Sequence, residues 1–170
     1  MGFAAIYSLA GPSSAMSAEA VVVRAAANSV VNSVERSQAL FGDKSVAISN
    51  LWALANQCAE AGWDGQGALS MNRSAIYNAV AFIRALPDGV LLPEIAPEPD
   101  GSVSLDWIKS RNRLFSMSVG SSNRLAYAWL DGTDKGHAVA RFDEGRVPQR
   151  ILDGISAIMA TERDAAVRSR

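Results

Sequence analysis

The sequence predicts an α+β fold in which a single antiparallel β-meander of about four strands is covered by N-terminal helices and a C-terminal helix. In the first half of the chain, apolar residues recur every three or four positions, which is typical of helices packed by one face. In the second half they alternate with polar residues, as in half-buried strands. The links between the alternating segments are short and polar, which favours antiparallel hairpins over the long crossovers of a parallel sheet.

The composition indicates one domain with a core of its own. Of the 170 residues, 49% are hydrophobic, and 16 basic residues against 17 acidic ones give a formal net charge of −1. This balance provides no overall field that would attract nucleic acid or an anionic membrane. We expect a poorly ordered N-terminal extension over residues 1–16, a single α+β domain over residues 17–162 and a charged tail over residues 163–170.

The N-terminal extension contains an apolar run at residues 3–10 and a Gly-Pro-Ser-Ser break at residues 11–14. No Lys or Arg precedes the run, and it is much shorter than the ~20 residues of a membrane-spanning helix. We therefore expect a cytoplasmic protein, and an export signal is the alternative.

Two helices are predicted before the glycine-rich turn near residue 65. The first covers residues 17–40, although three consecutive valines at residues 21–23 leave a strand there as an alternative. Gly42 would end this helix, and Asp43 or Ser45 would cap the second. We expect the two helices to form a hairpin. The apolar stripe of the second helix consists of Ile48, Leu51, Trp52, Ala55 and Cys58.

A third helix is predicted after that turn, with Ser70 or Asn72 as its N-cap and Pro87 as its end. Its stripe consists of Ile76, Ala79, Val80, Ile83 and Leu86. Three prolines within residues 91–99 exclude a helix and a central strand there. This segment should be extended, at an edge or over the surface.

The predicted strands place their large residues on one face of the sheet, and the helices should cover that face. The large residues are Trp107, Phe115, Met117, Val119, Tyr127 and Trp129. A fourth, less regular strand covers residues 137–142. The last helix should begin near Pro148 and pack through Ile151, Leu152, Ile155 and Ile158.

The turn at residues 62–68, Gly-Trp-Asp-Gly-Gln-Gly-Ala, combines an indole and a carboxylate with three glycines. Such a segment suits a structured turn or a recognition surface, and both interpretations stay open. We favour the structural one, in which Trp63 inserts into the core and Asp64 accepts hydrogen bonds from backbone N–H groups of the turn.

The order of these segments resembles a family of small uncharacterised bacterial proteins. The resemblance covers about residues 45–160 and runs from the G-W-D-G-x-G-A turn through a Ser-started helix and Leu-Pro to the proline-spaced segment. It ends at Pro-Asp-Gly, which leads into Leu105-Asp106-Trp107. It implies a bacterial, cytoplasmic protein and no established activity.

The sequence offers few groups for catalysis, because the chain has one histidine and one cysteine. Cys58 lies on an apolar stripe and is expected to be buried, and His137 is expected to be solvated in a strand. The chain has no phosphate-binding loop, dinucleotide fingerprint or hydrolase elbow motif. We therefore predict no catalytic residue, no metal site and no cofactor.

We favour a non-enzymatic protein-interaction or accessory module of a bacterial system, antitoxin-like or defence-associated. Its candidate binding residues are Trp63, Asp64, Arg111, Arg113 and Arg124. The expected partner is a protein, a membrane partner is not expected, and the sequence leaves homo-oligomerisation open.

Two alternatives belong to other classes of function. The first is a hydrolase or divalent-metal enzyme that uses loop carboxylates. These carboxylates are Asp64, Glu94, Glu98, Asp100, Asp106, Asp131 and Asp134. The second is weak nucleic-acid binding through Arg111, Arg113 and Arg124, which we expect around two hairpins on one side of the sheet. The near-zero net charge disfavours it.

Overall fold

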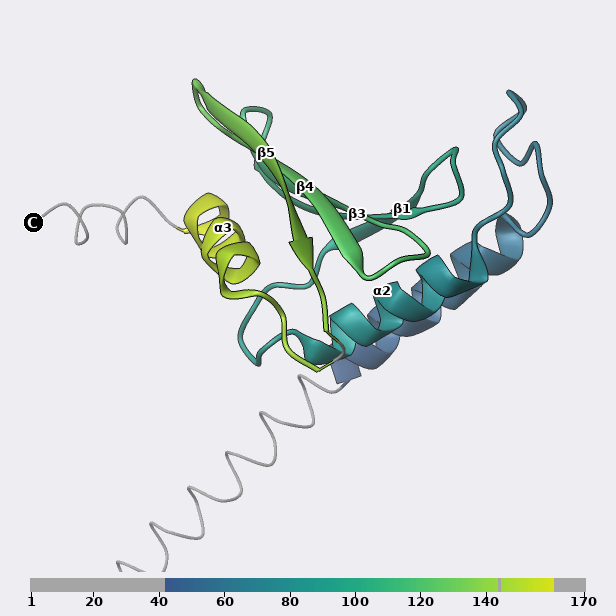
Figure 1. Cartoon of the computed structure of the whole chain (residues 1–170), viewed down its shortest axis with the longest axis horizontal. Coiled ribbons are helices and arrows are strands. Elements are labelled where there is room, and N and C mark those ends of the chain that lie inside the picture. The colour runs from purple at the N-terminus through teal and green to yellow at the C-terminus, as the bar shows by residue number, and fades with distance from the viewer. Residues whose placement is uncertain (1–41, 144, 161–170) are drawn as a thin grey trace, which may run out of the picture. The chain divides into compact units, whose positions relative to one another are not determined.

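Three helices and one five-stranded antiparallel sheet make up the part of the chain that the structure describes (Figure 1). The structure is a computed structural model, and it describes residues 42–143 and 145–160. The expectations for residues 1–16, 17–40 and 163–170 lie outside these residues. The α+β class is confirmed, with five strands instead of about four.

The described elements have simple consecutive topology, because each strand pairs with the next one along the chain in the order β1-β2-β3-β4-β5. They are a helix over residues 42–57, α2 (Arg73–Ala85), β1 (Glu94–Pro97), β2 (Val103–Ser110), β3 (Arg113–Val119), β4 (Arg124–Asp131), β5 (Asp134–Arg141) and α3 (Gln149–Met159). None of these helices is long and apolar enough to cross a membrane.

The helix over residues 42–57 differs from the prediction at its start. Gly42, Asp43 and Ser45 are all helical, so the predicted helix end at Gly42 and the predicted caps at Asp43 or Ser45 are wrong. Ser45 Oγ donates instead to the Gly42 carbonyl, 2.8 Å away within the same helix. A glycine lowers helix stability by only about 1 kcal/mol, and burial of Leu51 in the core can offset that cost.

Residues 42–57 and α2 form a hairpin of helices, whereas the predicted hairpin with residues 17–40 lies outside the described residues. Lys44 Nζ, near the start of the first helix, donates to the Leu86 carbonyl just after α2, and the Met71 N–H just before α2 donates to the Cys58 carbonyl. The two helices are therefore antiparallel. Asn72 caps α2 as predicted, with its Oδ1 accepting from two backbone N–H groups of the first turn.

One face of the sheet carries the core. Both α2 and α3 pack against β2 and β3. The side chains of Trp107, Phe115 and Met117 are fully buried there, which confirms the predicted apolar face. The opposite face, here called the open face, is not covered by any helix among the described elements (Figure 1). Since neither helix packs mainly on β4 or β5, the helix-side cover of the sheet thins toward β5.

The fifth strand comes from the proline-containing segment. Residues 94–97 pair antiparallel with β2, with Glu94 opposite Asp106 and Pro97 opposite Val103. The prediction of an extended segment at an edge is confirmed. It was not counted as a strand because two prolines stand within or directly beside it, at Pro93 and Pro97.

Candidate functional site

The glycine-rich turn uses its polar groups to hold itself together. Asp64 Oδ1 accepts hydrogen bonds from the N–H groups of Gln66 (2.8 Å) and Ala68 (3.0 Å), as predicted. These backbone bonds, first that from Ala68 and then that from Gln66, hold the pKa of the Asp64 carboxyl below its usual range. Trp63 is half-buried against the core, and its Nε1 donates to the Leu69 carbonyl (2.9 Å). The arrangement fits a structural turn.

The three candidate arginines do not form one surface. Arg113 Nε lies 2.8 Å from Asp131 Oδ1, and its guanidinium donates to the Ala157 carbonyl of α3. Arg124 stands at the other end of β4 from Asp131, seven residues and therefore about 23 Å along the strand. Arg111 is exposed in the turn between β2 and β3. The expectation of arginines together on one side of the sheet is wrong. These three arginines therefore do not form the basic patch that the nucleic-acid alternative requires.

The one cysteine and the one histidine of the chain are placed as expected. Cys58 is 4% exposed, and burial raises the pKa of its thiol, which keeps it protonated and unreactive. His137 is exposed on the open side of β5.

The carboxylates do not converge on a metal site in the described ranges. Within residues 42–143 and 145–160, no group of three or more His, Cys, Asp or Glu side chains is close enough to hold a metal ion. The carboxylate of Asp64 is already bonded to its own turn. Among the described residues, the geometry therefore gives no support to the divalent-metal form of the enzyme alternative.

A network of serines and carboxylates on the open face was not predicted. Each of two carboxylates accepts from two serine hydroxyls on neighbouring strands or turns. Ser102 and Ser118 donate to Glu98, and Ser104 and Ser116 donate to Asp106. A signal was present in the sequence, since serines alternate along both β2 and β3.

The serine hydroxyls form hydrogen bonds with the carboxylates on the acidic side of the open face. Ser102 also bonds Asp100 through its hydroxyl (2.6 Å) and its backbone N–H (2.9 Å), and these two bonds lower the pKa of the Asp100 carboxyl. Because the hydroxyls are engaged with carboxylates, and Ser102 is 6% exposed, the network acts as structural bonding between β1, β2 and β3.

Charges on the open face are divided between the two halves of the sheet. The acidic groups lie beside β1 and β2, and the basic groups and the histidine lie on β4 and β5. Register places Arg124 opposite Arg141, and Lys135 and His137 share the same face. The centre between them carries the small side chains Ser104, Ser116, Ser118, Ala126 and Ala128.

Within the described residues, no strand pairs with the outer edge of β5, which is here called its free edge. The register pairs Arg141 with Arg124, so the next pair is Phe142 with Asn123, and the Phe142 N–H donates to the Asn123 carbonyl (2.8 Å). In antiparallel pairs, hydrogen-bonded and non-hydrogen-bonded positions alternate. The even-numbered residues of β5 therefore bond β4. The N–H and C=O groups that point away from β4 belong to Lys135, His137, Val139 and Arg141.

The free edge of β1 is closed by the same rule. The Glu98 N–H donates to the Ser102 carbonyl (3.0 Å), so the even-numbered residues of this strand bond β2 and the odd-numbered ones face away. Two of the outward positions are prolines, Pro93 directly before β1 and Pro97 at its end, and proline has no N–H. Only one of the two sheet edges thus offers a regular row of donors.

A cavity of about 260 Å³ lies beside β5, between α3 and the helix side of β3, β4 and β5. Aromatic, aliphatic, small and charged residues all contribute to its lining. The lining residues are Phe115, Tyr127, Trp129, Asp131, Asp134, Arg150, Gly154, Ala157 and Ile158. The ring of Trp129 lies directly against the Gly136 backbone, where a Cβ atom would be 2.5 Å from Cη2. The indole therefore reaches across β5 toward the free edge.

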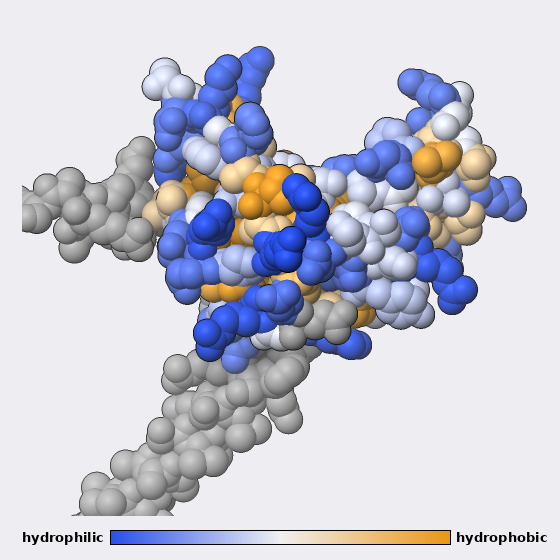
Figure 2. All heavy atoms as spheres, viewed as in Figure 1, coloured by the Kyte–Doolittle hydropathy of each residue, from blue (hydrophilic) through white to orange (hydrophobic). Residues whose placement is uncertain are grey.

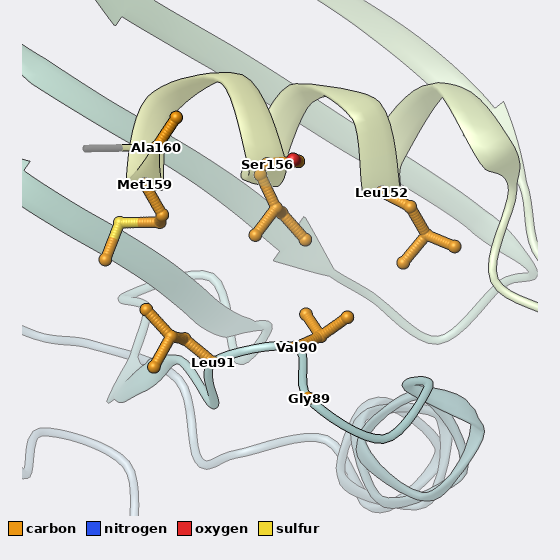
Figure 3. A pocket seen from close by; sticks show the side chains of 8 residues that line it. Gly89, Val90, Leu91, Leu152, Ser156, Met159 and Ala160 are labelled. Atoms are coloured by element: carbon orange, nitrogen blue, oxygen red, sulfur yellow. The ribbon is translucent and has the colours of Figure 1, made fainter. Parts of the chain in front are cut away.

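A second cavity, of about 280 Å³, lies between α3 and residues 89–91 (Figure 3). Val90 and Leu91 face Leu152 and Met159 across it, and Ser156 is the one polar side chain among its lining residues.

Figure 1 shows β5 as the near edge of the sheet, and Figure 2 shows apolar surface over this strand between hydrophilic residues. Among the described residues, Val139 is one of the exposed large apolar side chains, at 45% exposure.

Comparison of the chain with protein-family models, with curated proteins and with solved structures finds no match. The function must therefore be argued from this geometry.

Proposed function

We propose that this chain is a protein-interaction module that binds an extended segment of a partner protein as an additional strand along β5. The observation that carries the proposal is the contrast between the two sheet edges. Prolines remove outward donors at β1, whereas β5 keeps all of them.

Unprotected edge strands are a hazard, because they can pair with other chains. Proteins commonly protect them by short length, by bulges, by proline or by charged side chains. β5 has eight residues, no proline and an uninterrupted register with β4, and charge, at Lys135 and Arg141, is the one of these protections that it carries. An edge of this kind is suited to pairing with another strand, and each backbone hydrogen bond made there would contribute about 0.5–1.5 kcal/mol.

A bacterial and cytoplasmic setting is part of the proposal and is supported by the sequence resemblance alone. The proposal rests on the geometry of the sheet edge.

The substitution that tests the edge is Val139→Pro. The Val139 N–H points away from β4, so proline removes one edge donor and adds a ring at the edge without breaking a bond to β4. Val139→Thr is the matched control, since it keeps the N–H and the β-branched shape.

The assay begins with selection of nine-residue peptides from a random displayed library on the full chain. Selected peptides should shift the amide resonances of Lys135, His137, Val139 and Arg141. Binding should be lost in Val139→Pro and kept in Val139→Thr, with thermal unfolding confirming that both variants fold. A selection that returns no binder, or binders that Val139→Pro leaves unaffected, would overturn the proposal.

A further inference from the structure

We infer that the segment recognised along β5 is acidic on one side and apolar on the other. Carboxylates at alternate positions would face Lys135, His137 and Arg141 on the open face. A bulky apolar side chain between them would reach Trp129 on the helix side. This inference rests on the proposed function and specifies the chemistry of the partner.

The open side of the edge carries positive charge that the described residues do not neutralise. The side chains of Lys135, His137 and Arg141 are exposed on this face, and Arg124 lies opposite Arg141 on β4. None of the arginines or lysines among them forms an ion pair in the described part of the chain. Residues directly opposite on adjacent strands have Cβ atoms about 4.5–5.5 Å apart, so carboxylates of an added strand would pair with these groups.

The same charges oppose a second copy of this chain in the two registers that pair the most residues of β5. A continuous sheet with two-fold symmetry pairs odd-numbered residues with odd-numbered ones, because the open faces must match. A register centred on Ala138 puts Lys135 of each copy opposite Arg141 of the other. A register centred on His137 puts the two histidines together. The free edge of β1 in another copy is no substitute, since Pro93 and Pro97 have no N–H.

The helix side of β5 has room for a large side chain. Its residues on that side include Gly136, Ala138 and Ala140, so the strand itself contributes little bulk to the layer between sheet and helices. The indole of Trp129 crosses the backbone at Gly136, and the 260 Å³ cavity lies next to it. An apolar side chain from an added strand, placed beside Gly136, would therefore contact the indole and gain burial.

A nucleic acid fits this surface less well than an acidic strand. The open face beside the basic residues carries Ala126 and Ala128, so it lacks aromatic rings on which bases could stack. The opposite half of the same face is acidic, with Glu98 and Asp106. A backbone of phosphates extending across the sheet would meet like charge.

Three capped nine-residue peptides test the inference on the full chain, by fluorescence anisotropy at fixed ionic strength. The acidic peptide alternates glutamate with valine and carries one phenylalanine among the valines. Its twins replace all glutamates by lysine, or the phenylalanine by alanine. The acidic peptide should bind at least about tenfold tighter than the lysine twin, because two cross-strand charge pairs, at Lys135 and Arg141, become repulsive in that twin, and about tenfold tighter than the alanine twin.

Charge reversal on the protein provides the matching variants. Lys135→Glu/Arg141→Glu should invert the preference between the acidic and the lysine peptide. Arg73→Glu/Lys109→Glu changes the net charge equally at exposed positions away from β5 and should leave the preference as it was. A preference that follows net charge in both pairs of variants would overturn the inference.

The remaining outcomes separate this inference from the proposed function. If both charged peptides bind alike and Val139→Pro abolishes both, the inference fails and the edge-binding function stands. If Val139→Pro leaves acidic-peptide binding intact, both fail. The inference is also overturned by tighter binding of a single-stranded oligonucleotide than of the acidic peptide. Dimerisation that Val139→Pro abolishes would also overturn it. So would protection of the Val139 amide from hydrogen exchange in the free monomer, because it would show that the chain covers its own edge.

Discussion

Gly136→Ala tests whether the indole of Trp129 really lies across β5. Gly136 has no positive φ, so its backbone accepts alanine without strain, and the only obstacle is the neighbouring ring. A Cβ at this position would stand 2.5 Å from Cη2 and 2.9 Å from Cε2 of Trp129. Carbon atoms in favourable contact are about 3.5–4.0 Å apart. The indole must therefore move by about 1 Å or more, or β5 must move with it.

The expected loss of stability follows from two opposing terms. Forcing an extra methyl group into a packed site costs about 1–3 kcal/mol. Replacing glycine by alanine returns about 0.4–1 kcal/mol, because the unfolded chain loses conformational freedom. The free energy of unfolding of Gly136→Ala should therefore fall by about 1–2 kcal/mol, which corresponds to a decrease in Tm of about 2–8 °C for a chain of 170 residues.

The assay combines urea unfolding with NMR of the indole N–H groups, and the Trp129 signal is assigned from Trp129→Leu. In Gly136→Ala, this signal should shift while the other indole signals stay in place. Gly120→Ala is the matched control, because a Cβ there meets nothing within 4 Å, and its free energy of unfolding should stay unchanged or rise by up to about 1 kcal/mol.

The double variant gives the decisive result. Once Trp129→Leu has removed the ring, Gly136→Ala should no longer destabilise the protein and should become neutral or slightly stabilising. The reasoning is refuted if Gly136→Ala is as stable as the parent with an unmoved Trp129 signal. It is also refuted if the destabilisation persists unchanged in the Trp129→Leu background.

Two further predictions concern the helices and the glycine-rich turn. Gly154→Ala should lower the free energy of unfolding by about 1–2 kcal/mol, because its Cβ would stand 2.6 Å from the Phe115 ring and outweigh the gain in helix propensity. Gly42→Ala, also helical but with nothing within 4 Å, should raise it by up to about 1 kcal/mol in the same urea titration. Asp64→Asn should destabilise the protein near pH 6. Because hydrogen bonds lower the pKa of Asp64 in the folded state, its contribution exists above the unfolded pKa, so the difference between variant and parent should shrink as the pH falls from about 5 to about 2. A difference independent of pH would contradict this assignment.

The predictable part of the fold is the part where side-chain periodicity and burial agree. Trp107, Phe115 and Met117 alternate with polar residues because one sheet face is packed and the other is not, and a sequence pattern can report that. The helix through Gly42 could not be predicted in the same way. The helix preference lost at one glycine is only about 1 kcal/mol, so tertiary packing can outweigh it. In addition, Asp43 and Ser45 directly after Gly42 match the residue pattern of a helix start.

The candidate site also has features that the sequence could predict and features that it could not. The hydrogen bonds of Asp64 are local, so residue type and spacing were enough to predict them. The positions of Arg113 and Arg124 depend on the topology. Consecutive hairpins of a meander lie at opposite ends of the sheet, so the two arginines are separated by the length of a strand. The outward donors of β5 were missed because the hydrogen-bonding phase of an antiparallel pair is set by its register, and composition does not contain it.

The two edges of the sheet show that the hydrogen-bonding phase of an edge strand, more than its amino-acid composition, determines which residues present backbone donors outward. Prolines at Pro93 and Pro97 close β1 only because they fall on odd-numbered positions; one residue later, each would have broken a bond to β2. On β5, the positions that expose backbone donors also carry Lys135 and Arg141. These charges oppose pairing of β5 with itself, and they attract a strand of opposite charge. Protection from self-association and selection of an acidic partner therefore follow from the same residues. Lys135→Glu alone should weaken acidic-peptide binding and, because it sets a carboxylate opposite Arg141 of a second copy, should also remove the barrier to self-pairing.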